Sequence, residues 1–330
     1  QYTENPTSVP FYSDLATYKC EQNKIVWDLR DIAEKAKLFD SLSSNAVRIL
    51  PLGGAVFHES RVGSTMVSNL LTTLGRVYSE PGPIYTAFSA CTSRDGQLIP
   101  DCDTKEQQRL LQDVFYMMQR SNTQQSNPPR RVFFKFGSRL TAHIAKFTEL
   151  FPHTPWIFLY RDPIEVLVSH QKKAACFSKT YLPKDIKKDI GSRGADGKSV
   201  WDKHDIQFCA AQLAGICESA LQHIHHNGRL VNHRQLPTEL WDEVLPKHFG
   251  IATTGKERQR MERLSERYSK RRRDIVGKDW NSDGVRKHID STPETRFAAS
   301  TFLNPTYTKL EGARKRQTAG WVQQLLSFRR

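Results

Sequence analysis

A basic residue, a glycine and two hydroxyl residues come directly after a predicted buried strand, in the stretch HESRVGSTM at residues 58–66. Apolar residues then recur at helical spacing up to Leu74, and Gly75 is a helix stop signal. Ser64 or Thr65 is expected to cap this helix. Free backbone N–H groups at a helix N-terminus point at an anion, and the helix dipole favours it. This stretch therefore predicts a phosphate-binding loop.

A second stretch combines an arginine at a predicted strand end with a serine on the following helix. Residues 156–160, WIFLY, have the pattern of a buried strand, and Arg161 follows them. Asp162 at the cap and Glu165 three residues later are typical of a capping box. Ser169 lies seven residues after Asp162, and thus on about the same helix face. Arg161 and Ser169 are expected to hold a further anion between them.

Together the two stretches resemble the donor-binding motifs of sulfotransferases. Residues 58–66 resemble the 5′-phosphosulfate loop of that family, and an arginine followed eight residues later by a serine resembles its 3′-phosphate site. The resemblance is clear over about residues 53–175 and looser over about 230–307. It implies 3′-phosphoadenosine 5′-phosphosulfate as the sulfate donor. The donor-binding residues that it implies are Arg61, Val62, Gly63, Ser64, Thr65, Met66, Arg161 and Ser169.

The resemblance also implies catalytic roles for three residues. Sulfuryl transfer depends on positioning, on neutralising the leaving oxygens and on removing the acceptor's proton. Arg61 takes the basic position of the loop and would neutralise the 5′-phosphate. Lys135, a costly cation inside the apolar strand 131–136, corresponds to a lysine that approaches the transferring sulfate. Glu80, nineteen residues after Arg61, corresponds to the general base of Golgi-type and many bacterial members.

The identity of the general base stays open at this stage. Cytosolic sulfotransferases place a histidine two residues after the strand-end lysine, where this chain has Gly137. Glu80 is expected in a loop directly beyond the first helix, where the donor's anions would raise its pKa. His143 is the alternative base.

Alternating strands and helices predict an α/β fold that brings both motifs to one edge of a sheet. Parallel pairing with right-handed crossovers gives a three-layer α/β/α arrangement around a central parallel sheet, the P-loop-like sulfotransferase fold, with added helices in the C-terminal half. Ligands of such sheets bind beyond the carboxyl ends of the strands. Residues 23–330 are expected to form one domain after a stem or arm at 1–22, with a basic substrate-side lid at 170–204. Further helices are expected at 27–42, 104–120, 140–150, 205–226, 236–249 and 256–273, and a further strand at 229–232.

Composition limits the partners without choosing the acceptor. The 330 residues are 38% hydrophobic and 25% charged, which fits one large α/β domain. The net charge of +14 favours anionic partners of any kind, so the acceptor, whether glycan, peptide or small molecule, and the oligomeric state stay open. No aromatic residues are interleaved with the cluster at Arg271–Arg273, which argues against nucleic acid. No apolar run is long enough to span a bilayer, but the chain begins with Gln, so a removed N-terminal anchor stays possible.

The six cysteines form no Cys-x-x-Cys pair, which argues against zinc. Cys91 and Cys102 flank a polar loop and can bridge in an oxidising compartment, whereas Cys209 and Cys217 share a predicted helix two turns apart and cannot join. The even count favours the Golgi or another secretory lumen slightly over the cytoplasm, although no usable Asn-x-Ser/Thr site is present. A further group of histidines lacks companion ligands, so no metal site is predicted. These are His223, His225, His226 and His233.

Two other functions compete with sulfate transfer. A P-loop kinase-like enzyme needs Gly-x-x-x-x-Gly-Lys-Ser/Thr, and this loop lacks both the first glycine and the lysine. A non-catalytic anion- or glycan-binding protein on the same scaffold would keep the loop and lose the base. The glycine at position 137, where cytosolic members have their histidine, keeps this second alternative open.

Overall fold

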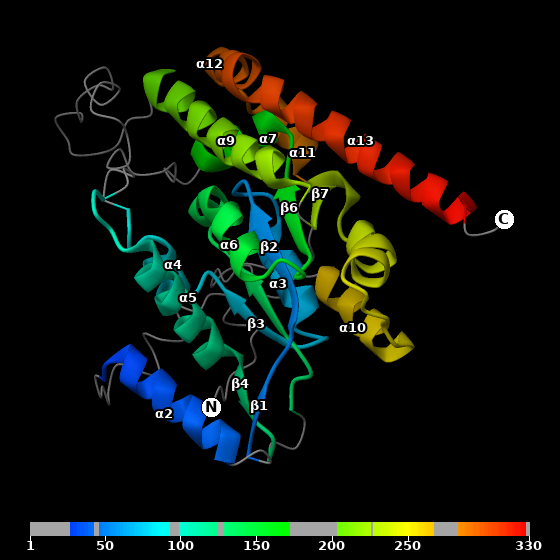
Figure 1. Cartoon of the computed structure of the whole chain (residues 1–330). Coiled ribbons are helices and arrows are strands. Elements are labelled where there is room, and N and C mark those ends of the chain that lie inside the picture. The colour runs from blue at the N-terminus through cyan, green and yellow to red at the C-terminus, as the bar shows by residue number, and fades with distance from the viewer. Residues whose placement is uncertain are drawn as a thin grey trace, which may run out of the picture.

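The computed structural model (Figure 1) describes residues 27–42, 46–92, 99–124, 128–171, 203–225, 227–266 and 283–327. The predicted arm at 1–22 and nearly all of the predicted lid at 170–204 lie outside these residues. No described helix combines the length and the apolar character needed to cross a membrane.

A parallel sheet of five strands forms the centre of the molecule, in the order β3-β5-β2-β6-β7. The predicted buried strands are confirmed, because every residue of β5, β6 and β7 is buried. The register places Lys135 beside both Val56 and Ser79, so the carboxyl ends of β2, β3 and β5 lie next to one another. The strands are β2 (Leu52–His58), β3 (Arg76–Ser79), β5 (Val132–Lys135), β6 (Trp156–Tyr160) and β7 (Gly228–Asn232).

Strand β3 corrects the prediction that Glu80 lies in a loop directly beyond the first helix. A four-residue edge strand, paired with β5, separates that helix from Glu80. Gly75 does more than stop the helix, because a Cβ there would lie 2.5 Å from the carbonyl oxygen of Arg131. The close approach lets the chain turn into β3, and Glu80 leaves the strand with a left-handed φ of 54°.

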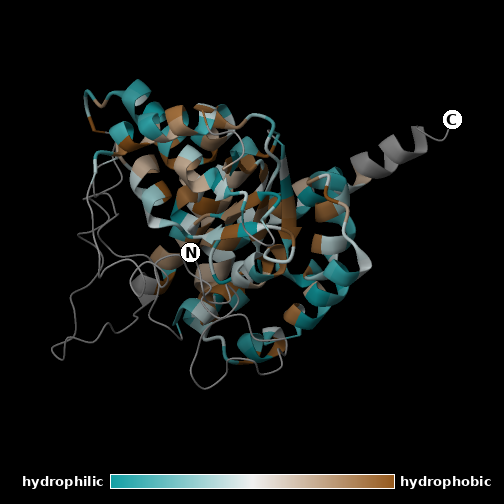
Figure 2. Cartoon of the chain, turned by 90° about the horizontal axis from the view of Figure 1, so that it is seen from below, coloured by the Kyte–Doolittle hydropathy of each residue, from teal (hydrophilic) through white to brown (hydrophobic). Residues whose placement is uncertain are grey.

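Helices cover both faces of the sheet. The connection from β2 to β3 moves along the sheet in one direction, and the connections from β3 to β5, β5 to β6 and β6 to β7 move in the opposite direction. Because such connections are right-handed, the helix after β2 lies on one face of the sheet and the helices of the later connections lie on the other. Hydrophobic residues gather between these layers (Figure 2), where the ring of Phe57 packs against those of Phe136 and Phe147 at centroid distances of 4.8 and 5.5 Å. On the first face α3 (Ser64–Leu71) contacts α10 (Gly255–Ser265). On the second lie α4 (Gly82–Phe88), α5 (Thr104–Gln119), a 3₁₀ turn (Ser138–His143), α6 (Ile144–Leu150) and α9 (Lys203–His223).

Further elements from both ends of the chain lie outside the five-stranded sheet. The predicted N-terminal helix is α2 (Leu29–Leu42), which packs on α5, and a small antiparallel pair joins β1 (Val47–Ile49) to β4 (Arg120–Asn122). The predicted helix at 236–249 is a π-helical segment (Leu240–His248). The C-terminal helices pack against α9 and against α7 (Pro163–Gln171). They are α11 (Gly284–Ile289), α12 (Pro293–Ala298), a π-helical segment (Ala299–Leu303) and α13 (Asn304–Ser327).

The two predictions about cysteine pairing are confirmed. Cys91 and Cys102 form a disulfide with a Cα–Cα distance of 5.5 Å. Cys209 is also disulfide-bonded, but not to Cys217, which is a buried free thiol.

Candidate functional site

The carboxyl ends of three neighbouring strands bring together a lysine, a glutamate and a histidine. Lys135 ends β5, Glu80 follows β3 and His58 ends β2. The ammonium of Lys135 forms an ion pair with Oε1 of Glu80, and Nε2 of His58 lies 3.7 Å from the same oxygen. The backbone N–H of Glu80 also donates to the carbonyl oxygen of Lys135 at 2.7 Å. The turn after β3 therefore fixes Glu80 against the end of β5.

This ion pair is asymmetric in its exposure to solvent. The side chain of Lys135 is only 1% exposed, whereas that of Glu80 is 38% exposed. Burial alone would raise the pKa of Glu80, but the charges of Lys135 and His58 outweigh it and hold that pKa well below its usual range. Glu80 is thus an ionised carboxylate that reaches solvent, while Lys135 is a buried cation that depends on it for charge balance.

The loop between β2 and α3 owes its shape to left-handed backbone conformations. Ser60, Arg61 and Gly63 have φ values of 127°, 58° and 82°. Gly63 occupies the N-cap position of α3 and makes no side-chain cap hydrogen bond, so the predicted capping by Ser64 or Thr65 is wrong. Glycine is needed at position 63 for a second reason, because a Cβ there would lie 2.9 Å from Nδ1 of His233.

Helix α3 therefore begins at Ser64, earlier than a cap at Ser64 or Thr65 would allow. This start places three of the predicted donor-binding residues inside the helix. Ser64, Thr65 and Met66 all lie in the first turn of α3, and Val62 is fully buried just before it. The first N–H groups of a helix have no acceptor one turn earlier, although the N–H of Met66 already donates to the carbonyl oxygen of Gly63 at 2.9 Å. The geometry thus presents an anion-binding helix start directly after Arg61.

Arg61 and Ser169 join the two predicted motifs. Nε of Arg61 donates to Oγ of Ser169 at 3.0 Å, across 108 residues of sequence. Ser169 lies on α7 and is buried. The structure thus brings the loop after β2 and the helix after β6 into direct contact, although the serine accepts from Arg61 and not from Arg161.

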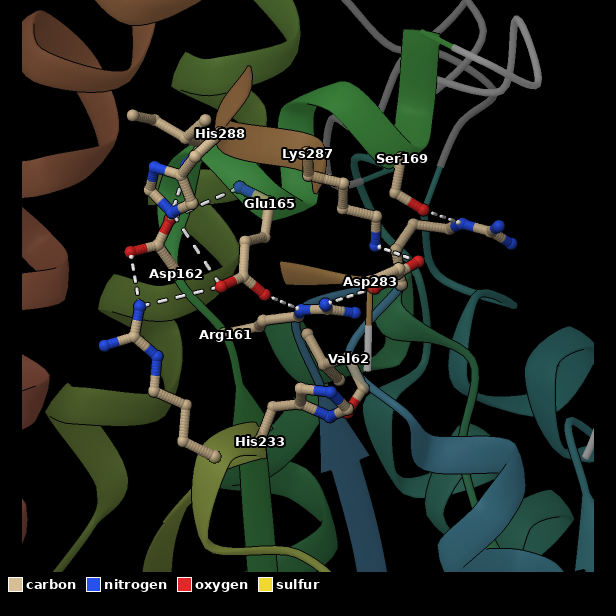
Figure 3. A network of polar contacts seen from close by, with 12 residues as sticks. Val62, Arg161, Asp162, Glu165, Ser169, His233, Asp283, Lys287 and His288 are labelled. Atoms are coloured by element: carbon tan, nitrogen blue, oxygen red, sulfur yellow. Dashed lines mark hydrogen bonds and ion pairs between the residues drawn. The ribbon is translucent and has the colours of Figure 1, made fainter. Parts of the chain in front are cut away.

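Arg161, at the end of β6, lies among carboxylates (Figure 3). Its Nε donates to Oε2 of Glu165 at 2.5 Å, and its Nη2 donates to Oδ1 of Asp283 at 2.7 Å. Glu165 was expected to complete a capping box. Its side chain pairs with the arginine instead, and Asp162 alone caps α7 by accepting from the N–H groups of Ile164 and Glu165 at 3.1 and 3.3 Å.

The carboxylates around Arg161 form one larger ionic cluster. Arg234 lies 3.2 Å from Asp162 and 3.5 Å from Glu165, and His288 lies 3.2 and 3.8 Å from the same two residues. Asp162, Glu165 and His288 have the spacing of potential metal ligands. Because two arginines already balance both carboxylates, the cluster is built as an ion-pair network.

His233, one of the four histidines considered as metal ligands, lies beside the loop after β2, and His226 lies outside the described residues. Nδ1 of His233 lies 3.2 Å from the carbonyl oxygen of Val62, so this histidine supports the loop. Burial and the nearby charge of Arg161 lower the pKa of His233 to about 4, which keeps it neutral at pH 7. His143, the alternative base, packs on Phe88 at a centroid distance of 5.6 Å, and burial lowers its pKa.

Arg314, in the basic run near the C-terminus, pairs with Glu311 at 2.7 Å.

Sequence reasoning missed several polar residues of this region. Glu59 is fully buried, and its Oε2 accepts from the backbone N–H of Arg161 at 3.1 Å, which ties the loop to the end of β6. Burial raises the pKa of Glu59 to about 8, so it is mostly protonated at neutral pH. Its position beside His58 at a strand end was the available signal. Asp283 and Lys287 gave none, because 122 residues separate Asp283 from Arg161.

A comparison with protein-family models finds no match, and a comparison with curated proteins finds no similar sequence. Among solved structures, this chain is similar to a sulfotransferase from Alicyclobacillus acidocaldarius, with 10% identity and a TM-score of 0.43, over 80% of this chain and 96% of that one. The similarity concerns the arrangement of the chain and assigns no role to any residue. The chain itself is an α/β protein with a central parallel sheet of five strands.

Proposed function

We propose that this protein is a sulfotransferase that moves the sulfuryl group of 3′-phosphoadenosine 5′-phosphosulfate to an acceptor hydroxyl or amine and releases adenosine 3′,5′-bisphosphate. One observation carries the proposal. The loop with Arg61, the strand-end cations Lys135 and Arg161, and Ser169 all converge at the carboxyl edge of one parallel sheet. Nucleotides bind at this edge in open α/β sheets.

The residues of this edge can perform each part of an in-line displacement. The first N–H groups of α3, together with Arg61, would hold the 5′-phosphate and neutralise it as its bond to sulfur breaks. Lys135 would stabilise the charge on the transferring group. Glu80, ionised and half-exposed, would take the proton from the acceptor oxygen or nitrogen as that atom bonds to sulfur. Arg161 and Ser169 would bind the 3′-phosphate.

Donor binding would change these contacts. Lys135 pairs with Glu80 in the free protein, and this pairing keeps the pKa of the carboxyl low. When Lys135 turns towards a sulfate oxygen, Glu80 loses part of its counter-charge and its pKa rises towards neutrality. The base would then gain proton affinity only in the complex that needs it.

Titration calorimetry with adenosine 3′,5′-bisphosphate tests donor binding. We expect micromolar or tighter binding to the wild-type protein without added magnesium. Arg61→Ala and Arg161→Ala should weaken it, and Arg109→Ala, an exposed arginine on α5, serves as the matched control. No heat with the wild-type protein would overturn the proposal.

Transfer itself is tested with radiolabelled donor and a panel of sugars, tyrosyl peptides, sterols and small alcohols. We expect label in at least one acceptor, and none with Arg61→Ala. Donor binding without transfer to any acceptor would favour the non-catalytic alternative. Magnesium-dependent ATP turnover would favour a kinase-like enzyme.

A further inference from the structure

One of the two carboxylates on Arg161 differs from the other in its exposure. Glu165 is 6% exposed and lies on α7, one helical turn after the arginine. Asp283 is 53% exposed and belongs to a segment far along the chain. Its second oxygen lies 3.0 Å from Nζ of Lys287, so one carboxylate bridges a buried arginine and a buried lysine. Figure 3 shows Asp283 between these two cations.

Local structure leaves the carboxylate of Asp283 available for this bridge. It occupies the N-cap position of α11 but makes no side-chain cap hydrogen bond, so its carboxylate is directed to the cations and not to the helix. The next residue, Gly284, allows the close approach of α11 to α7, because a Cβ there would lie 2.8 Å from Oε1 of Glu165. Lys287 is one turn further along α11.

The charges explain why this position needs an anion. Arg161 and Lys287 are both buried, and the charge of Arg161 adds to burial in lowering the pKa of Lys287. Hydrogen bonds from both cations outweigh burial and hold the pKa of Asp283 below its usual value. Two buried cations without a counter-ion would be costly. A phosphate group carries more negative charge than a carboxylate and offers more acceptor oxygens, so it can satisfy the same two cations.

We propose that Asp283 is an internal competitor of the donor's 3′-phosphate: it occupies the Arg161–Lys287 cation pair in the free protein and is displaced when the nucleotide binds. This inference rests on the proposed function. Glu165 stays in place, because it is buried and belongs to the same strand–helix unit as Arg161. The half-exposed Asp283 can turn into solvent at little cost.

The competition has a consequence for turnover. Donor and bisphosphate product carry the same 3′-phosphate, so both bind against Asp283. Return of the carboxylate to the cations lowers the free energy of the emptied site and favours release of the product. Product release limits the rate of many enzymes, so weaker product binding is useful.

Calorimetry on Asp283→Asn tests the inference with two nucleotides. Asparagine keeps the shape of the side chain but removes the charge. We expect the variant to bind adenosine 3′,5′-bisphosphate roughly tenfold more tightly than the wild type, the size of one charge-assisted interaction removed. Adenosine 5′-monophosphate has no 3′-phosphate, so its affinity should not change. Asp290→Asn on the same helix, where Asp290 lies 3.8 Å from Arg286, is the matched control and should change neither affinity.

The outcomes separate this inference from the function on which it rests. Wild-type binding of the bisphosphate with equal or weaker binding by Asp283→Asn would overturn the inference alone. A tenfold gain for both nucleotides would also overturn it, because the gain would not depend on the 3′-phosphate. If adenosine 3′,5′-bisphosphate binds neither the wild type nor the variants, the proposed function and the inference are both overturned. Asp283→Ser, which retains an N-cap residue, is the second variant if melting shows that the asparagine variant is unfolded.

Discussion

The site contains two ion pairs that are alike in construction and different in what supports them. In each, a buried cation at a strand end meets a half-exposed carboxylate: Lys135 with Glu80 and Arg161 with Asp283. Lys135 has Glu80 as its carboxylate partner among the ion pairs of the described residues, and both come from neighbouring strands of the sheet. Arg161 has a second, buried carboxylate in Glu165.

The difference indicates which carboxylate can leave. Arg161 would stay paired with Glu165 if Asp283 turned away, so the proposed 3′-phosphate site could exchange Asp283 for a ligand. Lys135 is 1% exposed and pairs with Glu80, so loss of the Glu80 charge removes an anion from a buried cation. The first arrangement suits reversible binding. The second suits chemistry, because the lysine and the base respond together to the donor's charge.

Among changes to these two ion pairs, replacement of Glu80, the proposed base, should give the largest effect. We expect Glu80→Gln to lower sulfate transfer by about 10² to 10⁴-fold, the range for loss of a positioned general base. Affinity for adenosine 3′,5′-bisphosphate should change little, because glutamine still accepts a hydrogen bond from Lys135. Radiolabel transfer and calorimetry measure the two quantities, with Glu149→Gln on the exposed surface of α6 as the control. Full activity would place the base elsewhere.

Removal of the Lys135 charge should give the second largest loss of sulfate transfer. Lys135→Met keeps the length of the side chain in its buried position and should reduce transfer by about 10² to 10³-fold, as for loss of one transition-state donor. The folded state should survive, because the remaining Glu80 is half-exposed and can be solvated. Single-turnover transfer measures the loss and thermal melting the stability. Unchanged transfer would reduce Lys135 to a structural residue.

Loss of Arg161, the second strand-end cation, should weaken binding of the nucleotide. Arg161→Ala should weaken the bisphosphate by roughly tenfold to a hundredfold and leave adenosine 5′-monophosphate nearly unaffected. It should also destabilise the protein by about 3 kcal/mol, because Glu165 is left buried with a weaker counter-charge. Chemical denaturation of Arg161→Ala, with and without Glu165→Gln, checks the second effect. Near-normal bisphosphate affinity would contradict the 3′-phosphate assignment.

The smallest effect on transfer and donor binding is expected at Glu59, which connects the two ion-paired regions and should act on stability. Its pKa is raised to about 8 in the folded protein and lies near 4.3 in an unfolded chain. The stability that it contributes is therefore full below about pH 4 and is lost as the pH rises to about 8. Glu59→Gln should flatten this decline by up to about 1.4 kcal/mol per pH unit. Denaturation at pH 5 and pH 8 tests this, and parallel curves for both proteins would contradict the raised pKa.

Much of the sheet was predictable because most of its strands are rich in apolar residues. The predicted strands ending at Phe136, Tyr160 and Asn232 are all buried parallel strands. The edge strand at Arg76–Ser79 was missed because four residues with two half-buried side chains carry too little periodic signal. Because this strand was not predicted, Glu80 was placed in a loop directly after the first helix, although Glu80 itself was named as a candidate base.

The sequence by itself determined the two strand–turn–helix units for which anion binding is proposed, since the residue types and spacing of each unit are local. Only the tertiary structure decided what those residues contact. The pairing of Lys135 with Glu80 depends on β3 lying beside β5, and the bridge from Arg161 to Asp283 depends on α11 packing against α7. Charged side chains choose partners through space, and sequence separations of 55 and 122 residues leave no periodic trace of that choice.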